Sequence, residues 1–326
     1  MLRLGLWWRA LVAIVGVTLR RVRRGRALPG WTWSHEVIAT GMKREFARLA
    51  RLPWDVQRDT WRALALPAFT VRGVRFDRTT LGGRGAVWIT PRGLNRGDEP
   101  ILFYLHGGAY HFGSIEEYLD YVARLARAAR AKAIVVDYRL APEHPFPAAF
   151  DDALTAYEAL LDSGVPASKV IVIGDSAGGG LTAALLVALR TRGLPLPAAG
   201  VMVCPWVDLG AQGGSLVSKQ AHDVFTPELV EGWARSALAG ADARDPRVSP
   251  LHAELKGLPP LLVQVGGAEM IVDQVVAFAD RARAAGVDVR LRVWESCFHD
   301  WPVYAAVLAD GRRAIDEVGA FVRTLK

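Results

Sequence analysis

Short apolar runs alternate with longer amphipathic stretches over most of the chain from about residue 69 onward. Some of the runs, such as residues 170–173, are apolar at every position, which is typical of strands in a parallel sheet that is covered on both faces. The runs predict strands at Val71–Phe76, Ala86–Thr90, Ile101–His106, Ala133–Tyr138, Val170–Gly174, Gly200–Cys204, Leu261–Val265 and Val289–Val293.

The amphipathic stretches between the later strands have the length and the period of helices. They predict helices at Tyr118–Arg130, Ala149–Leu161, Ala177–Arg190, Gln274–Ala285 and Val303–Leu325. Strands that alternate with helices favour an α/β fold in which helices flank a mostly parallel sheet, here of eight strands.

Two segments do not follow this alternation. Residues 1–66 are mostly helical in pattern, and residues 209–250 stand between a strand and the next helix–strand unit. Open α/β sheets bind ligands at the carboxyl ends of their strands, where loops and added segments carry function. We therefore expect a helical cap built from 1–66 and from about 209–250, on a catalytic domain that spans 67–326.

The basic charge of the chain is confined to its first thirty residues. The formal net charge is +7, but residues 1–30 hold seven arginines and no acid, and the remainder carries 33 basic and 33 acidic residues. A protein that binds nucleic acid is expected to carry its basic residues on the folded domain. No nucleic-acid partner is therefore predicted.

Residues 1–26 combine that charge with an apolar stretch from Leu4 to Leu19. As a helix this stretch is about 24 Å long, shorter than the ~30 Å hydrocarbon core of a bilayer. At ~100° per residue one side of the helix holds Arg9, Ala13, Gly16, Arg20 and Arg24, whereas Trp7, Leu11, Val15 and Leu19 lie elsewhere. We expect a helix that lies in a membrane surface; the alternatives are a cap helix with its apolar side on the core, or a span.

The two cysteines, Cys204 and Cys297, form neither a disulfide framework nor the spacing of metal ligands. They are interpreted as reduced core thiols, and no metal or other cofactor is predicted. No small-residue cleavage signal follows the first apolar stretch, so a cleaved secretory peptide is not expected. These features favour a cytoplasmic protein, peripheral at the inner membrane surface if the first helix binds lipid.

The segment from Val170 to Gly179 reads as a strand, a sharp turn and a helix. Its turn, Gly174-Asp175-Ser176-Ala177-Gly178, fits the G-x-S-x-G pattern of a nucleophilic serine. Glycines two residues on either side let strand and helix approach closely, and the helix N-terminus favours negative charge on a reacting oxygen. Ser176 is therefore the candidate nucleophile.

A second glycine-rich turn, His106-Gly107-Gly108-Ala109-Tyr110, follows an apolar strand about 70 residues before the serine. Consecutive glycines leave backbone N–H groups free to converge on one oxygen. We expect Gly107, Gly108 and the amide of Ala177 to form an oxyanion hole, and His106 to anchor the loop.

The acid and the base are sought after the serine, because this arrangement places them in the order Ser, Asp/Glu, His. Of seven histidines only His299 follows the last strand in a short loop, so it is the candidate base. The loop after Leu261–Val265 offers two acids, Glu269 and Asp273. Both can reach the serine, because the carboxyl ends of parallel strands meet at one edge of a sheet.

The chain resembles the hormone-sensitive-lipase-like esterases, bacterial family IV, over about residues 68–326. The resemblance is carried, in order, by HGGAY, VDYRLAPEHPFPAAFDDA (136–153), IGDSAGGGL, PWVDL, AEMIVD and FHDWP. It implies an α/β-hydrolase fold with a helical cap and cofactor-free hydrolysis of small esters with short acyl chains.

The sequence departs from the family pattern at two positions. Ala109 replaces the third glycine of the usual HGGG but keeps the amide. In the family the acid stands first in D-P-L-x-D; aligning Asp273 with the last aspartate puts Glu269 in the acid's place, without the proline. Glu269 is therefore the predicted acid and Asp273 the second candidate. We expect the pocket among Tyr110, His111, Phe112, Asp175, Trp206 and Asp208.

The predicted activity is hydrolysis of small esters with short-to-medium acyl chains through a Ser-His-Glu triad and an acyl-enzyme intermediate. Hydrolysis of lactones or aryl formamides is the main alternative. A receptor for small molecules that lacks catalysis is disfavoured, because Ser176 and His299 are both present. The sequence does not predict an oligomeric state.

Overall fold

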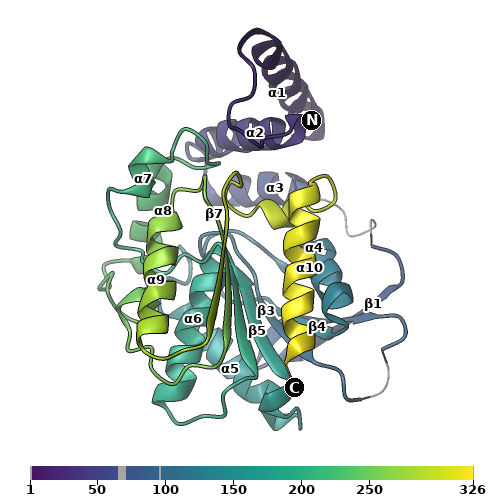
Figure 1. Ribbon diagram of the computed structural model, residues 1–326, viewed down its shortest axis with the longest axis vertical. Helices are drawn as coiled ribbons and strands as arrows, with labels where there is room; N and C mark the ends of the chain where they lie inside the picture. The colour runs from purple at the N-terminus through teal and green to yellow at the C-terminus, as the bar shows by residue number, and fades with distance from the viewer. Residues whose placement is uncertain (1, 65–70, 95–96, 326) are drawn as a thin grey trace.

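An eight-stranded sheet forms the centre of the molecule (Figure 1). The computed structural model describes residues 2–64, 71–94 and 97–325, apart from the side chains of residues 2–7 and 64. The strands are β1 (Val74–Leu81), β2 (Arg84–Pro91), β3 (Ile101–Leu105), β4 (Lys132–Val136), β5 (Val170–Asp175), β6 (Ala199–Val203), β7 (Leu261–Gly266) and β8 (Val289–Trp294). They lie in the order β1-β2-β4-β3-β5-β6-β7-β8. β2 runs antiparallel to both of its neighbours and all other pairs are parallel, as the sequence predicts for most of the sheet.

Helices cover both faces of this sheet. Side chains along each strand alternate between the two faces, so neighbouring residues pack against different helices. Leu102 and Tyr104 of β3 pack with α4 (Ile115–Ala129) and α10 (Ala309–Thr324). Phe103 and Leu105 face the opposite way, into the core shared with α5 (Ala148–Asp162), α6 (Ser176–Thr191) and α9 (Val272–Ala284). The fold is therefore the predicted α/β-hydrolase fold.

One predicted helix begins too early. The expected helix at 303–325 is a 3₁₀ turn, Trp301–Tyr304, followed by α10. Leu308, which precedes α10, has the extended backbone angles φ −102° and ψ 125°, so the helical path is interrupted there. The other predicted strands and helices after residue 71 are present, with ends that differ by up to a few residues.

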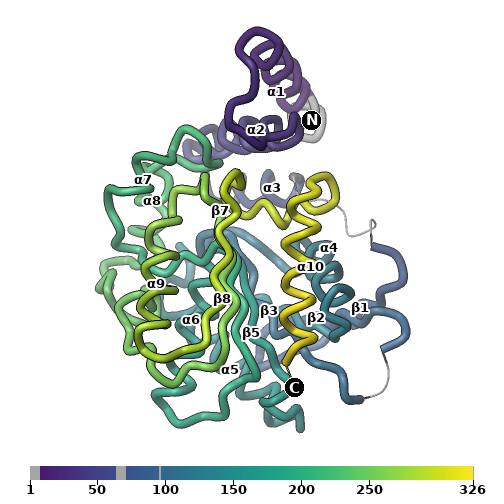
Figure 2. The backbone as a smooth tube through the Cα atoms, in the orientation of Figure 1, coloured from purple at the N-terminus to yellow at the C-terminus, as the bar shows by residue number. Residues whose placement is uncertain are grey.

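The two segments outside the alternation are mostly helical. The first contains α1 (Leu2–Arg24), α2 (Trp33–Leu49) and α3 (Trp54–Leu64), and the second contains α7 (Ser215–Ser218) and α8 (Pro227–Leu238). α1 is outermost and α2 lies between α1 and the rest of the molecule (Figures 1 and 2). The predicted boundary at residues 66 and 67 lies outside the described residues, and the division into cap and catalytic domain stays a prediction.

α1 packs on α2 through its arginine-bearing side. Arg9 forms an ion pair with Glu45, and Arg20 and Arg21 form ion pairs with Glu36. Ala13 and Val17 are buried on this side, whereas Leu11, Val15 and Leu19 on the opposite side are exposed. The alternative in which the apolar side packs on the core is therefore wrong; the Trp7 side chain lies outside the described residues. Among the helices that the structure describes, none combines the length and hydropathy needed to cross a bilayer.

Candidate functional site

Ser176 stands at the sharp turn between β5 and α6. Its backbone has φ 51°, in the left-handed region that non-glycine residues rarely adopt. A Cβ on Gly174 would lie 2.3 Å from the Gly178 oxygen, and one on Gly178 would lie 2.1 Å from the Leu105 oxygen. Both positions therefore require glycine, as the close approach of strand and helix predicts.

A chain of two hydrogen bonds joins the serine to a buried acid. Nε2 of His299 lies 2.8 Å from Oγ of Ser176, and Nδ1 lies 2.5 Å from Oε2 of Glu269. The other carboxylate oxygen of Glu269 accepts the N–H of Gly266 at 2.6 Å. The structure thus brings together the three residues that the sequence analysis selected as nucleophile, base and acid.

The second candidate acid lies elsewhere. Asp273 is exposed in the first turn of α9, where its carboxylate accepts the N–H of Ser215 at 2.8 Å. Ser215 also donates its hydroxyl to the Met270 oxygen at 2.6 Å. Asp273 therefore fixes the start of α7 on the loop after β7 and makes no contact with His299.

The charges around His299 favour its protonated form. Burial of the imidazole lowers its pKa, but Asp300 and Glu269 outweigh burial and raise the pKa above its ordinary value. Burial also raises the pKa of Glu269, which the hydrogen bond from His299 partly offsets. A carboxylate beside Nδ1 orients the ring and stabilises an imidazolium.

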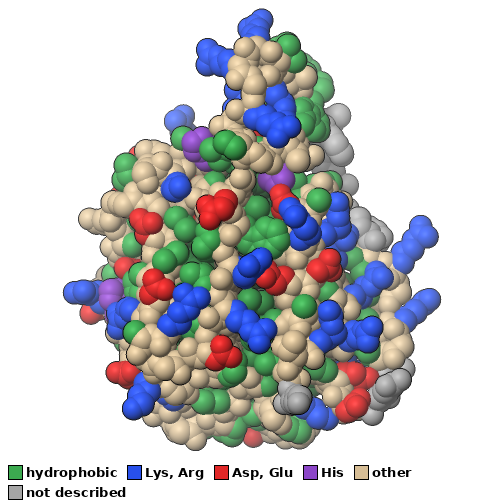
Figure 3. Space-filling model, in the orientation of Figure 1, with side chains coloured by type: hydrophobic (Ala, Val, Ile, Leu, Met, Phe, Trp, Pro, Cys, Tyr) green, Lys and Arg blue, Asp and Glu red, His purple; other side chains and the backbone are tan. Residues whose placement is uncertain are grey.

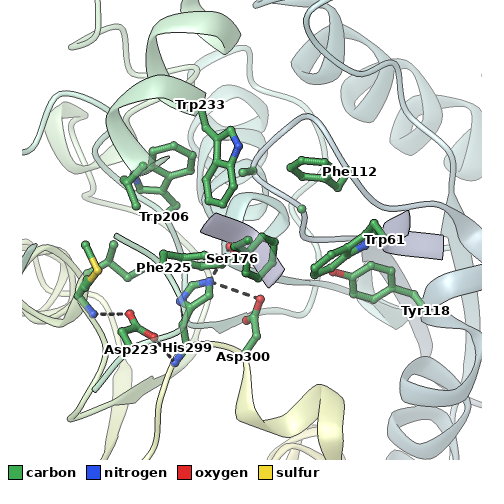
Figure 4. Close-up of a pocket in the computed structure, with 16 residues that line it drawn as sticks. Trp61, Phe112, Tyr118, Ser176, Trp206, Asp223, Phe225, Trp233, His299 and Asp300 are labelled. Atoms are coloured by element: carbon green, nitrogen blue, oxygen red, sulfur yellow. Dashed lines mark hydrogen bonds and ion pairs between the residues drawn. The ribbon is translucent and has the colours of Figure 1, made fainter. Parts of the chain in front are cut away.

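Two acids that the sequence analysis did not select lie against this site. Asp223, in the segment before α8, is buried; its oxygens accept the N–H groups of His299 at 3.0 Å and of Met270 at 2.7 Å (Figure 4). Asp300 places Oδ2 3.4 Å from Nε2 of His299. Asp300 could have been selected from its place next to the base, whereas no pattern around Asp223 indicates its role.

The N-terminal segment covers the loop that carries His299. Trp31 donates its indole N–H to the Ser296 oxygen, and the Ser296 hydroxyl donates to the Pro29 oxygen at 2.7 Å. The Trp31 ring meets Phe298 edge to face, with ring centroids 6.2 Å apart. Residues before α2 therefore support the backbone next to the base.

The glycine-rich loop after β3 meets the serine, but its amides are used differently from the prediction. The N–H of Gly107 donates to Oδ1 of Asp175 at 2.9 Å, so it is not free for a substrate oxygen. Gly108 and Ala109 line the same cavity as Ser176, and their N–H groups have no acceptor among the described residues. The predicted role of Gly107 is therefore wrong, because the turn aims its amide behind the serine.

Asp175 lies beneath the site and does not line its cavity. Besides the Gly107 amide, its carboxylate accepts the hydroxyls of Tyr104 and Tyr118, the latter at 3.0 Å. A Cβ on Gly107 would lie 2.2 Å from this carboxylate, so a larger residue there would have to displace it. Asp175 is thus a tie between the serine turn and the glycine-rich loop, and its predicted place in the pocket is wrong.

A cavity of about 50 Å³ opens on Ser176, His299 and Asp300 (Figure 4). Its walls are mainly aromatic and include Phe46, Trp61, Phe112, Trp206, Phe225 and Trp233. Residues 1–66 supply two of these rings, and residues 209–250 supply two more. Phe112 and Trp206 hold the places expected from the sequence.

Besides Asp175, three residues expected in the pocket lie outside this cavity. Tyr110 lines a separate hollow beside α5. His111 stacks on Trp54, with ring centroids 4.4 Å apart, and Asp208 pairs with His252 at 3.3 Å. These residues lie in the loops that were expected to form the pocket, but their side chains do not line the cavity at Ser176.

Two groups of described side chains lie close enough to hold a metal ion: Cys204 with Glu269 and His299, and His35 with Cys297 and Asp310. Both thiols are buried and unpaired, as predicted. Burial raises the pKa of each thiol, which favours the neutral form over the thiolate that metals require. In the first group both ring nitrogens of His299 already have partners. The donor sets therefore fit a metal poorly.

Residues 102–303 match the model of the alpha/beta hydrolase fold family. The chain is 44% identical over 250 residues to an acetyl-hydrolase of Streptomyces hygroscopicus, which covers 76% of this chain and 82% of that relative. Among solved structures, a mutant of the esterase E40 is similar, with 42% identity and a TM-score of 0.83 over 87% of this chain and 96% of the other.

A solved esterase of the bacterial hormone-sensitive lipase family is 39% identical, with a TM-score of 0.81 over 88% of this chain and 97% of the other. The relatives that match most of this chain are thus described as an acetyl-hydrolase and as esterases. The chain therefore belongs to the α/β-hydrolase family, within which it is a carboxylesterase like those of the hormone-sensitive lipase group.

Proposed function

We propose that Ser176, His299 and Glu269 act as nucleophile, base and acid in the hydrolysis of esters with short acyl chains. The observation that supports this most directly is the chain of hydrogen bonds from Glu269 through His299 to Ser176, facing a cavity. Nε2 of His299 takes the hydroxyl proton as the serine oxygen attacks the ester carbonyl. Glu269 holds the ring by its Nδ1–H and stabilises the imidazolium.

The tetrahedral intermediate collapses by breaking the bond to the alcohol. His299 returns the proton to the departing oxygen, so the alcohol leaves neutral and the acyl group stays on Ser176. Water then attacks the acyl-enzyme by the same route, with His299 again as the base, and releases the carboxylic acid. The serine regains its proton.

The negative oxygen of each intermediate needs donors already in place. We assign the amides of Gly108, Ala109 and Ala177 to this role. Gly108 and Ala109 line the cavity beside the serine, and Ala177 lies in the first turn of α6, where helix amides lack intrahelical partners. Ala109 thus takes the place that the sequence analysis gave to Gly107.

The size of the cavity supports a short acyl group. An engineered cavity of ~150 Å³ holds benzene, so a space of about 50 Å³ fits only a few non-hydrogen atoms. The name of the Streptomyces relative, acetyl-hydrolase, points the same way. We propose acetyl to butyryl esters as the preferred substrates, with activity declining beyond about eight carbons.

The nucleophile is tested by covalent labelling. A p-nitrophenyl alkylphosphonate should attach to Ser176, with the site read by peptide mass spectrometry, and Ser176→Ala should lower kcat by about a million-fold. Label on another residue, or full activity of the alanine variant, would refute the assignment.

The substrate class is tested with p-nitrophenyl esters from acetate to palmitate, together with a lactone and an aryl formamide. kcat/KM should be highest for acetate to butyrate. A maximum at laurate or palmitate would contradict the small cavity, and faster turnover of the lactone or the formamide would establish the alternative activity instead.

A further inference from the structure

The outer side of α1 carries a stripe of exposed apolar side chains: Trp8, Leu11, Val12, Val15, Leu19 and Val22. Val22 is 82% exposed and Trp8 is 66% exposed. At ~100° per residue the six positions fall within an arc of about 100°, so they form one continuous face, named here the outer stripe. Five other large apolar residues are exposed in the described part of the chain, and one of them, Trp33, adjoins α1 through Thr18.

The segment that carries the outer stripe is strongly basic. Residues 1–51 contain eleven Lys and Arg but two acids, Glu36 and Glu45. Both carboxylates are buried, and each is shared by two arginines: Glu36 by Arg20 and Arg21, and Glu45 by Arg9 and Arg48. Arg23, Arg24 and Arg26 are exposed and pair with no described acid. Figure 3 shows these two kinds of side chain, green and blue, together on the projecting end of the molecule.

A groove of about 420 Å³ lies beside the contact between α1 and α2. Apolar residues, among them Trp8, Val12, Ile38 and Met42, line most of it, and Arg44 is one of its basic residues. Arg44 is exposed and has no acidic partner among the described residues. The groove thus offers an apolar space next to a cation, which suits the acyl chain and the anionic headgroup of a lipid.

We infer that α1 and α2 dock on the surface of an anionic lipid bilayer, with the outer stripe in the interface and the exposed arginines on the headgroups. An apolar face flanked by arginines is the composition of helices that lie in such an interface. A second copy of this chain is disfavoured as the occupant, because a symmetric contact would bring two strongly basic surfaces together. The anionic bilayer complements both the apolar and the basic features.

Docking also bears on the substrate, a consequence that rests on the proposed ester hydrolysis. α2 serves both sites: Phe46 lines the catalytic cavity, and the adjacent Glu45 holds Arg9 of α1. A bilayer bound by α1 therefore lies on the same side of the molecule as the cavity. The favoured natural substrates are short-acyl esters whose alcohol part partitions into the membrane.

Docking is tested by co-sedimentation of the full chain with vesicles of phosphatidylcholine, alone or with 30 mol% phosphatidylglycerol, at low and high salt. The wild type should bind the anionic vesicles, and salt should weaken the binding. R23Q/R24Q/R26Q should lower the partition coefficient about a hundred-fold, since each Arg near an anionic surface contributes about 1 kcal/mol. L11Q/L19Q should lower it more than ten-fold.

Matched controls carry the same changes on other exposed surfaces. R192Q/R244Q/K256Q and V217Q/V307Q should bind like the wild type, and all variants should hydrolyse dissolved p-nitrophenyl acetate at the wild-type rate, which shows that they fold. Equal binding to neutral and anionic vesicles, no binding by the wild type, or a dimer in light scattering that L11Q/L19Q abolishes would each overturn the proposal. Vesicle binding without esterase activity would refute the proposed function and leave the docking surface standing.

Discussion

The residues proposed as nucleophile and base are supported by different parts of the molecule. Ser176 is fixed by the sheet and its loops. Its turn packs on the end of β3, and the Asp175 carboxylate in that turn accepts hydrogen bonds from Tyr104 and Gly107. His299 is held by Glu269 after β7 and also by the segments outside the strand–helix alternation, because Asp223 accepts its backbone N–H and Pro29 and Trp31 bond to Ser296. The sheet and its loops thus set the position of the Ser176 hydroxyl, whereas the segments outside the alternation help to set the position of His299.

This difference implies that changes in residues 1–66 or 209–250 can alter catalysis without disturbing the proposed nucleophile. Asp223 illustrates the point, because it bonds to the acid loop at Met270 and to the base loop at His299. Movement of the segment before α8 would change the relation of both loops to the serine. A misplacement of ~1 Å far from the chemistry can cost about a hundred-fold in rate.

Among changes around His299, the largest loss of kcat is expected at Glu269, the proposed acid. Glu269→Gln should lower kcat about ten-thousand-fold, because the amide no longer stabilises the imidazolium and favours the wrong ring orientation. Asp273→Asn is the matched control and should change kcat less than ten-fold. Steady-state kinetics on p-nitrophenyl butyrate decide the matter, and a larger loss in the Asp273 variant would show that the acid is misassigned.

A smaller effect is expected at Asp223. Asp223→Ala removes the acceptor of two backbone N–H groups, so kcat should fall ten- to a hundred-fold with little change in KM. Asp242→Ala, in the exposed stretch that follows α8, should leave kcat unchanged. Equal loss in both variants, or a loss confined to KM, would mean that Asp223 does not position the base.

The smallest expected effect is a shift in the pH profile. Asp300 raises the pKa of His299, so the catalytic imidazole loses its proton, and kcat/KM rises, at a higher pH than an ordinary histidine would require. Asp300→Asn should move this acidic limb to lower pH while keeping the left-handed backbone, which asparagine tolerates. An unmoved or raised limb would contradict the assigned electrostatics.

Much of the nucleophile side could be predicted from the sequence, because its determinants are local. The apolar run, the glycines and Ser176 fall within ten consecutive residues, and each has a steric reason to be where it is. The exception is Gly107: consecutive glycines indicate free amides, but not that Asp175, 68 residues later, takes one of them.

The surroundings of His299 were harder to predict from the sequence, because the residues that support it are distant along the chain. Asp223 lies 47 residues from Met270 and 76 residues from His299, and an isolated acid in an irregular segment carries no pattern. For α1, the alternative in which the apolar side of the helix packs on the core was wrong. Helical periodicity separates its two faces, but ion pairs with Glu36 and Glu45 decide that the arginine side turns inward.

The contact of Trp31 with Ser296 joins positions 265 residues apart. At ~5–20 residues per second, a ribosome needs roughly 13 to 53 s to make the chain between them. During this time the indole has been made but the Ser296 oxygen has not, so this hydrogen bond cannot form. The support of the His299 loop by Trp31 is therefore among the last contacts to form, and a pause in translation before residue 296 delays it.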